Sequence, residues 1–87
     1  MNNLFNELLN SLSEEFKKYD LEESVQLSMS KLPEYDMQIN NLVKYNKSGF
    51  FEELQKNIIK KINESDLFKS TVINKIGFLN LELNHEF

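Results

Sequence analysis

The sequence predicts an α+β fold, a two-layer sandwich in which two helices pack on one face of a four-stranded antiparallel sheet. First, apolar residues recur at helical spacing in two segments, near residues 3–18 and 49–63. Second, each of these segments is followed by two short strand-like segments. The resulting order is helix, strand, strand, helix, strand, strand. This order favours a sheet that helices cover on one face and that is open to solvent or a partner on the other.

The first helix is predicted near residues 3–18. Its apolar stripe advances in steps of three or four residues and consists of Leu4, Phe5, Leu8, Leu9, Leu12 and Phe16. An acidic connector then leads into a strand at residues 24–30, where Val25, Leu27 and Met29 alternate with polar residues. We therefore expect these three apolar side chains to face the core.

Pro33 marks a turn between the first two strands, because proline has no amide donor and disfavours helix at the residue before it. A second strand is predicted at residues 35–40, with Met37 and Ile39 facing the core. The segment 40–46 is compatible with a continued strand or with a short helix, and we favour a helical turn.

The second helix is predicted near residues 49–63, with Ser48 as its N-cap. Glutamates lie near its start and lysines near its end, as the helix dipole favours. The helix residues that we expect to be largely buried are Phe5, Leu9, Leu12, Phe16, Phe51, Leu54, Ile58 and Ile62.

Two more strands are predicted at residues 68–73 and 78–84, joined by the segment 74–77. Alternation in the last strand places three leucines on the core face, Leu79, Leu81 and Leu83. The residues on its opposite face are then Phe78, Asn80, Glu82 and Asn84.

Phe78 and Asn80 form a candidate RNA-binding unit on this opposite face. An exposed phenyl ring offers a stacking surface for a base, and an amide two residues away can hydrogen-bond the edge of that base. Gln38 and Asn40 add two more amides on the polar face of the second strand. The structural alternative is that Phe78 covers the sheet edge or packs on a loop and that the amides are simply solvated.

The composition restricts how such a unit could work. The chain has 87 residues, enough for one domain spanning 1–87, and it has no cysteine, so folding depends on packing alone. All ten basic residues are lysines, and fourteen acids bring the net charge to −4. Nucleic-acid affinity comes mainly from clustered cations. Any RNA role must therefore be local, or shared with a more basic neighbour.

The sequence offers no catalytic or cofactor-binding arrangement, so we expect no enzyme, no metal and no cofactor. His85 is the one histidine, and Gly49 and Gly77 are the only glycines, which excludes a glycine-rich phosphate loop. No signal-like start and no run of about 20 apolar residues is present. We therefore expect a cytoplasmic protein with no membrane partner.

Two segments resemble motifs of one family, the N-terminal additional domain of arginyl-tRNA synthetases. Residues 36–40, Asp-Met-Gln-Ile-Asn, are similar to its Asp-aromatic-Gln-x-Asn segment, with Met37 in place of the aromatic residue. Residues 77–81, Gly-Phe-Leu-Asn-Leu, are similar to its terminal Gly-Phe-Ile-Asn strand. The approach to that strand, 74–77, reads Asn-Lys-Ile-Gly where the family has Ala-Gly-Pro-Gly. The resemblance covers residues 24–84.

The resemblance implies a non-catalytic tRNA-binding domain that contacts the D-loop corner of tRNA, and arginine tRNA as its partner. It also implies that Phe78 and Asn80 are among the groups that read a D-loop nucleotide. Such a domain acts as an accessory to a synthetase, so two contexts are open, a segment of a longer synthetase and a free-standing relative.

A second reading is an acidic protein-binding module, of the immunity or inhibitor type, that reuses this fold to cover a basic partner. The net charge of −4 and the absence of arginine favour it, because an acidic surface steers toward basic partners and away from phosphate.

Overall fold

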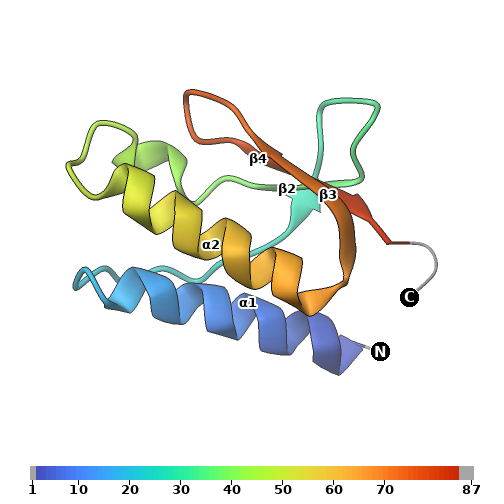
Figure 1. The fold of residues 1–87 in the computed structure, drawn as a ribbon, viewed down its shortest axis with the longest axis horizontal. Helices are drawn as coiled ribbons and strands as arrows, with labels where there is room; N and C mark the ends of the chain where they lie inside the picture. The colour runs from blue at the N-terminus through green and yellow to red at the C-terminus, as the bar shows by residue number, and fades with distance from the viewer. Residues whose placement is uncertain (1, 85–87) are drawn as a thin grey trace.

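A computed structural model describes residues 2–84. Its elements are α1 (Asn2–Lys17), β1 (Ser28–Met29), β2 (Met37–Ile39), the 3-10 helix η1 (Val43–Tyr45), α2 (Phe51–Ser65), β3 (Phe68–Ile73) and β4 (Leu79–Leu83). The strands form one antiparallel sheet in the order β1-β2-β4-β3. Both helices lie on the same side of this sheet (Figure 1). The predicted α+β class, order of elements and layering are confirmed, and η1 confirms the helical turn.

The core lies between the helices and the sheet. All four predicted residues of α2 are buried, as are Leu12 and Phe16 of α1. Phe5 and Leu9, also predicted to be largely buried, are only partly so, and Leu8 is buried instead. Phe5 lies near the start of α1, where its ring packs edge-on against Phe68 with centroids 6.0 Å apart.

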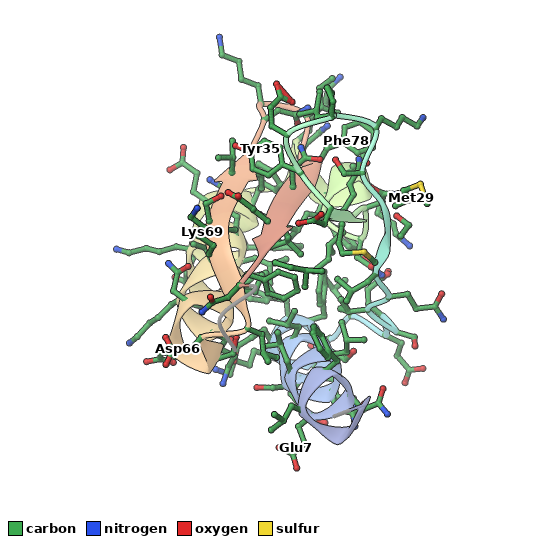
Figure 2. The ribbon with its side chains drawn as sticks, turned by 90° about the vertical axis from the view of Figure 1, so that its right-hand side faces the viewer. Glu7, Met29, Tyr35, Asp66, Lys69 and Phe78 are labelled. Carbon is green, nitrogen blue, oxygen red and sulfur yellow. The ribbon has the colours of Figure 1, made fainter. Side chains whose placement is uncertain are left out.

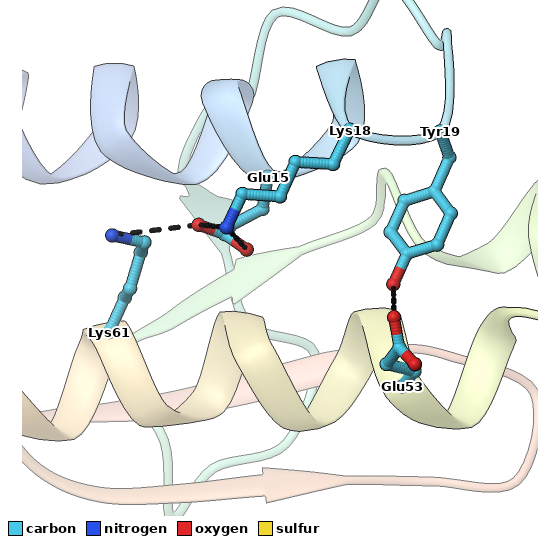
Figure 3. Close-up of polar contacts among 5 residues, drawn as sticks. All are labelled: Glu15, Lys18, Tyr19, Glu53 and Lys61. Carbon is cyan, nitrogen blue, oxygen red and sulfur yellow. Dashed lines mark hydrogen bonds and ion pairs between the residues drawn. The ribbon is translucent and has the colours of Figure 1, made fainter.

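A buried carboxylate joins the two helices. The Glu15 side chain is only 3% exposed, and it accepts from Lys18 Nζ at 3.0 Å and pairs with Lys61 Nζ of α2 at 3.5 Å (Figure 3). A second contact follows α1, where the Tyr19 hydroxyl donates to the Glu53 carboxylate. A charge without a partner in such a place would cost several kcal/mol, so the two lysines are needed to keep Glu15 buried.

The first strand is much shorter than the predicted 24–30. Val25 is buried as expected, but its N–H donates to Ser13 Oγ of α1 at 3.1 Å, so this part of the chain is tied to the helix layer. β1 is then an edge strand with two paired residues. The prediction that Met29 faces the core is wrong, because its side chain is 83% exposed at the edge of the sheet (Figure 2).

The start of α2 also differs from the prediction. Ser48 is not the N-cap: Phe50 holds that position and makes no side-chain cap bond. Ser48 Oγ instead donates to the Tyr45 carbonyl at 2.7 Å and closes the turn between η1 and α2. The helix begins at Phe51, two residues after the predicted start. It ends at Ser65, two residues beyond the predicted end.

A second buried carboxylate ties the connector after α1 to η1. Glu23 accepts from Asn41 Nδ2 at 2.8 Å, from Lys44 Nζ at 2.8 Å and from the Tyr45 hydroxyl at 2.5 Å. Burial acts to raise the pKa of Glu23, but the hydrogen bonds from its three partners outweigh it and hold that pKa below its usual range. Burial and the bond to Glu23 raise the pKa of Tyr45 to about 12.

Gly77 holds the β3–β4 hairpin against the segment before η1. Its φ is 113°, in the region that favours glycine. A Cβ at this position would lie 3.1 Å from Val43 Cα and 3.2 Å from the Leu42 carbonyl carbon and oxygen. These neighbours are backbone atoms, so they have little room to move aside.

We predict that Gly77→Ala lowers the free energy of unfolding by at least about 2 kcal/mol, from backbone strain and the contacts with Leu42 and Val43. Urea unfolding measures this change. Gly49→Ala is the matched control, because a Cβ at Gly49 meets nothing within 4 Å and its φ is not in the left-handed range. The control should be neutral or stabilising by about 0.4–1 kcal/mol. Equal stability of the two variants would contradict the packing described for Gly77.

A second prediction concerns alkaline pH. The pKa of Tyr45 is about 12 in the folded chain against 10.0 for an ordinary tyrosine, so folding favours the protonated phenol. Its contribution to stability is complete below pH 10 and is lost as the pH rises from 10 to 12. The free energy of unfolding of the unmodified protein, minus that of Tyr45→Phe, should therefore be smaller at pH 11 than at pH 8.5. Urea unfolding at the two pH values measures this difference. A constant difference would show that the phenol is not held by Glu23.

Candidate nucleic-acid interface

The two central strands bring together two of the predicted RNA-binding amides. β2 pairs with β4 so that Gln38 lies directly opposite Asn80. In the same cross-strand row, Ser28 of β1 lies beside Gln38 and Val72 of β3 lies beside Asn80. Directly opposed residues point to the same face of a sheet, with Cβ atoms about 4.5–5.5 Å apart. Gln38 and Asn80 therefore sit side by side in the middle of this row.

Both amides are less exposed than predicted. Gln38 is 5% exposed and Asn80 is 4% exposed, so the expectation that they lie on an open surface is wrong. Each lies on a central strand with a neighbour on both sides. In addition, Ser30, which follows β1, donates from Oγ to Asn80 Oδ1 at 2.8 Å and packs onto it.

The polar ends of these two amides nevertheless reach solvent. Among residues 2–84, Thr71 Oγ1 is the one fully buried side-chain nitrogen or oxygen without a hydrogen-bond partner. Gln38 makes no side-chain hydrogen bond within this range, and Asn80 uses only its Oδ1. The Gln38 amide and Asn80 Nδ2 therefore keep a small contact with solvent. The rest of each side chain is packed, which fixes the amides in place.

Asp36, the first residue of the 36–40 motif, has a structural role that sequence reasoning missed. Its N–H donates to the Leu81 carbonyl at 2.9 Å, and its Oδ2 accepts from the Leu83 N–H at 2.9 Å. Asp36 thus ties the start of β2 to the second half of β4. Its Leu83 partner is 47 residues away in the sequence, so no local pattern signals this bond.

Phe78 directly follows the segment 74–77, which we call the approach loop. Asn74 Oδ1 accepts hydrogen bonds from the N–H groups of Ile76, Gly77 and Phe78, each at 3.0 Å. This is an Asx-type turn, so Asn74 is a second positioning residue that the sequence analysis missed. The backbone is thus fixed up to Phe78, whose side chain is half-buried.

Asn40 and Phe78 lie at the same end of the central strand pair. β2 pairs Ile39 with Leu79, and Asn40 and Phe78 are the residues just outside this last pair. Asn40 is exposed, which confirms its predicted position on an accessible surface. The pairing of β2 with β4 thus brings Gln38 and Asn80 together and places Asn40 and Phe78 at one end of these two strands.

Two lysines without ion pairs among the described residues lie on the approach loop and on the loop before α2. Asn46 Nδ2 donates to the Ile76 carbonyl at 2.9 Å, which joins the loop before α2 to the approach loop. Lys47 and Lys75 stand on these two loops, and both are exposed with no carboxylate partner in the part of the chain that the structure describes. Two exposed cations therefore stand on the loops at this end of the molecule although the chain carries a net charge of −4.

Other kinds of site receive no support from the described residues. Within residues 2–84, no three His, Cys, Asp or Glu side chains are grouped so that they could hold a metal ion. His85 lies outside the described residues. Over the same described range, neither helix is long and apolar enough to cross a membrane.

Comparison with known proteins identifies the family. The model of the arginyl tRNA synthetase N terminal domain matches residues 2–83, nearly the whole chain. The comparisons with curated proteins and with solved structures gave no match. The match includes both motifs at which the central strands meet, residues 36–40 and 77–81. The chain therefore belongs to the family of arginyl-tRNA synthetase N-terminal domains.

Proposed function

We propose that this chain is a non-catalytic tRNA-binding domain that contacts the D-loop corner of tRNA with the surface around Phe78. The observation that carries the proposal is that the two family motifs meet in space, since β2 pairs with β4 so that Gln38 lies opposite Asn80. Membership in the synthetase family supports arginine tRNA as the partner. In this proposal residues 1–87 act as one domain in the cytoplasm, in a synthetase context, and need no cofactor.

The proposed roles follow from burial and hydrogen bonding. Phe78 offers its accessible ring face for stacking on an unpaired base. Asn80 and Gln38, held by their packed stems, present their amide groups to the edge of that base. Asn40 contacts the same nucleotide or the next one. Lys47 or Lys75 attracts the backbone phosphates, which supply affinity rather than selectivity.

The acidic protein-binding module remains a second candidate, favoured by the net charge of −4 and the absence of arginine. A gel-shift titration with tRNA at low and moderate salt separates the two functions. Binding that weakens as salt rises supports the tRNA domain, because phosphate contacts release counterions. Absence of binding at high protein concentration and low salt supports the protein-binding module.

We predict that Phe78→Ala weakens tRNA association by roughly 1–3 kcal/mol, the usual range for one stack between a base and an aromatic ring. The stability of the fold should change little, because the ring is only half-buried at the start of β4. Leu81→Ala is the contrasting variant: Leu81 is fully buried, so its truncation should cost about 2–5 kcal/mol of stability. Urea unfolding and tRNA binding are measured for both. If Phe78→Ala unfolds the chain as severely as Leu81→Ala, or leaves binding unchanged, Phe78 is structural and the proposed site is wrong.

Asn80→Ala should mainly reduce discrimination between D-loop nucleotides, because its amide reads a base edge while the lysines supply charge-dependent affinity. It should also lower stability by about 1 kcal/mol, since the hydrogen bond from Ser30 is lost. Ser30→Ala removes the same bond and leaves the Asn80 amide in place. Binding to tRNAs that differ at one D-loop nucleotide then separates the two effects. Loss of discrimination in both variants to the same extent would mean that Asn80 acts only through its position.

A further inference from the structure

A groove of about 400 Å³ lies between the start of α2 and the β3–β4 hairpin. The loops that frame it are close neighbours at one end of the molecule (Figure 1). Its apolar lining comes from Phe51, which is buried, and Ile73, which is half-buried. Its polar lining includes Asn46, Glu52 and Gln55. Lys75 of the approach loop completes it. The groove is of a size to receive one base together with its sugar.

The polar groups in this groove have unused hydrogen-bonding capacity. Gln55 is half-buried, and its side chain makes no hydrogen bond within the described residues. Glu52 and Lys75 are exposed and have no ion-pair partner in that same part of the chain. Asn46 donates its Nδ2 to the Ile76 carbonyl, which holds its side chain in place and leaves Oδ1 free to accept. The groove thus has an apolar surface bordered by the Glu52 carboxylate, the Asn46 and Gln55 amides and the Lys75 ammonium. These groups suit a ligand that carries several hydrogen-bond donors and a negative charge.

A guanine nucleotide has this combination of groups. Its N1–H and N2–H₂ donors lie side by side on the Watson–Crick edge and match the two oxygens of the Glu52 carboxylate, whereas uracil offers one donor there. Its six-membered and five-membered rings can lie against Phe51 and Ile73. Its phosphate suits the Lys75 ammonium. Because Glu52 repels phosphate, the base edge rather than the backbone must face it.

We propose that this groove binds an unpaired guanine nucleotide next to the nucleotide that stacks on Phe78. The inference rests on the proposed function, since it takes the ligand to be RNA. Lys75 and Phe78 belong to the same hairpin, which Asn74 and Asn46 hold rigid. The approach loop thus stands between two consecutive nucleotides, with one base on Phe78 and the other in the groove. The groove adds base selectivity to a surface with few cations.

The test uses guanosine 5′-monophosphate and uridine 5′-monophosphate as probes in parallel titrations followed by amide NMR. We expect GMP to shift the signals of residues 46, 55 and 75 and to bind at least about fivefold more tightly than UMP, as a two-point contact to the correct base predicts. Glu52→Gln should bring the ratio of the two affinities close to one. Lys75→Ala should weaken both nucleotides and leave their ratio unchanged.

Glu64→Gln is the matched control, since Glu64 is an exposed glutamate near the other end of α2 and should not alter the ratio. GMP shifts that arise elsewhere, or a GMP to UMP ratio that Glu52→Gln leaves unchanged, would overturn the groove as a guanine site. The proposed function has a separate readout in the tRNA gel shift. GMP binding in the groove without tRNA binding would support the guanine site and contradict the proposed tRNA-binding function. Binding of tRNA without GMP binding in the groove would support the tRNA-binding function and contradict the guanine site.

Discussion

The pairing of β2 with β4 is the interaction on which the rest of the fold depends. It joins the middle of the chain to its end through only three residue pairs, and both candidate motifs lie on it. So short a pairing does not fix its own register, and a slip by one residue would turn Gln38 and Asn80 into the core. The register is instead fixed from both ends. Asp36 bonds to the backbone of β4 at one end, and Gly77 packs against the Leu42 backbone at the other.

Buried carboxylates have a second organising role in a small chain without disulfides. Glu15 joins α1 to α2 through Lys61 and also pairs with Lys18 just after α1. Glu23 joins the connector after α1 to η1 through Asn41, Lys44 and Tyr45. Each of these contacts uses lysines for structure. Because the chain has only ten basic residues, this use reduces the number available to bind phosphate. Lys47 and Lys75 make no ion pair within the described residues, although Glu52 lines the same groove as Lys75.

Local patterns predicted the elements that are governed by local physics. The spacing of apolar residues predicted the bounds of both helices to within two residues, and β3 was predicted over its observed range, residues 68–73. The errors arose where distant contacts decide. Met29 is exposed because β1 is an edge strand, and the preceding residues are tied to α1 through Ser13. Ser48 bonds back to the carbonyl of Tyr45, so it closes a turn and does not cap α2.

The candidate site shows the same division between local and distant contacts. Alternation placed Gln38 and Asn80 on the face opposite the core, and the register puts them side by side there. Alternation along one strand does not show how closely neighbouring strands and Ser30 pack around these residues, so their burial was missed. The role of Asp36 was missed for a related reason, since only the folded chain brings its Leu83 partner within reach. Asn74 bonds to backbone groups two to four residues on, a local turn that the sequence analysis overlooked.

An acidic chain can still select a nucleotide if affinity and selectivity come from different groups. Affinity for nucleic acid scales with the number of phosphates neutralised, and the chain has ten basic residues against fourteen acidic ones. Selectivity requires fixed donors and acceptors, and burial of the Asn80 and Gln38 stems fixes them without consuming the Gln38 amide or Asn80 Nδ2. Repulsion from the remaining acids acts on every RNA alike, so it lowers non-specific binding more than it lowers the preference for a base that fits. A net charge of −4 is therefore compatible with a domain that adds discrimination to a partner whose own charge supplies the affinity.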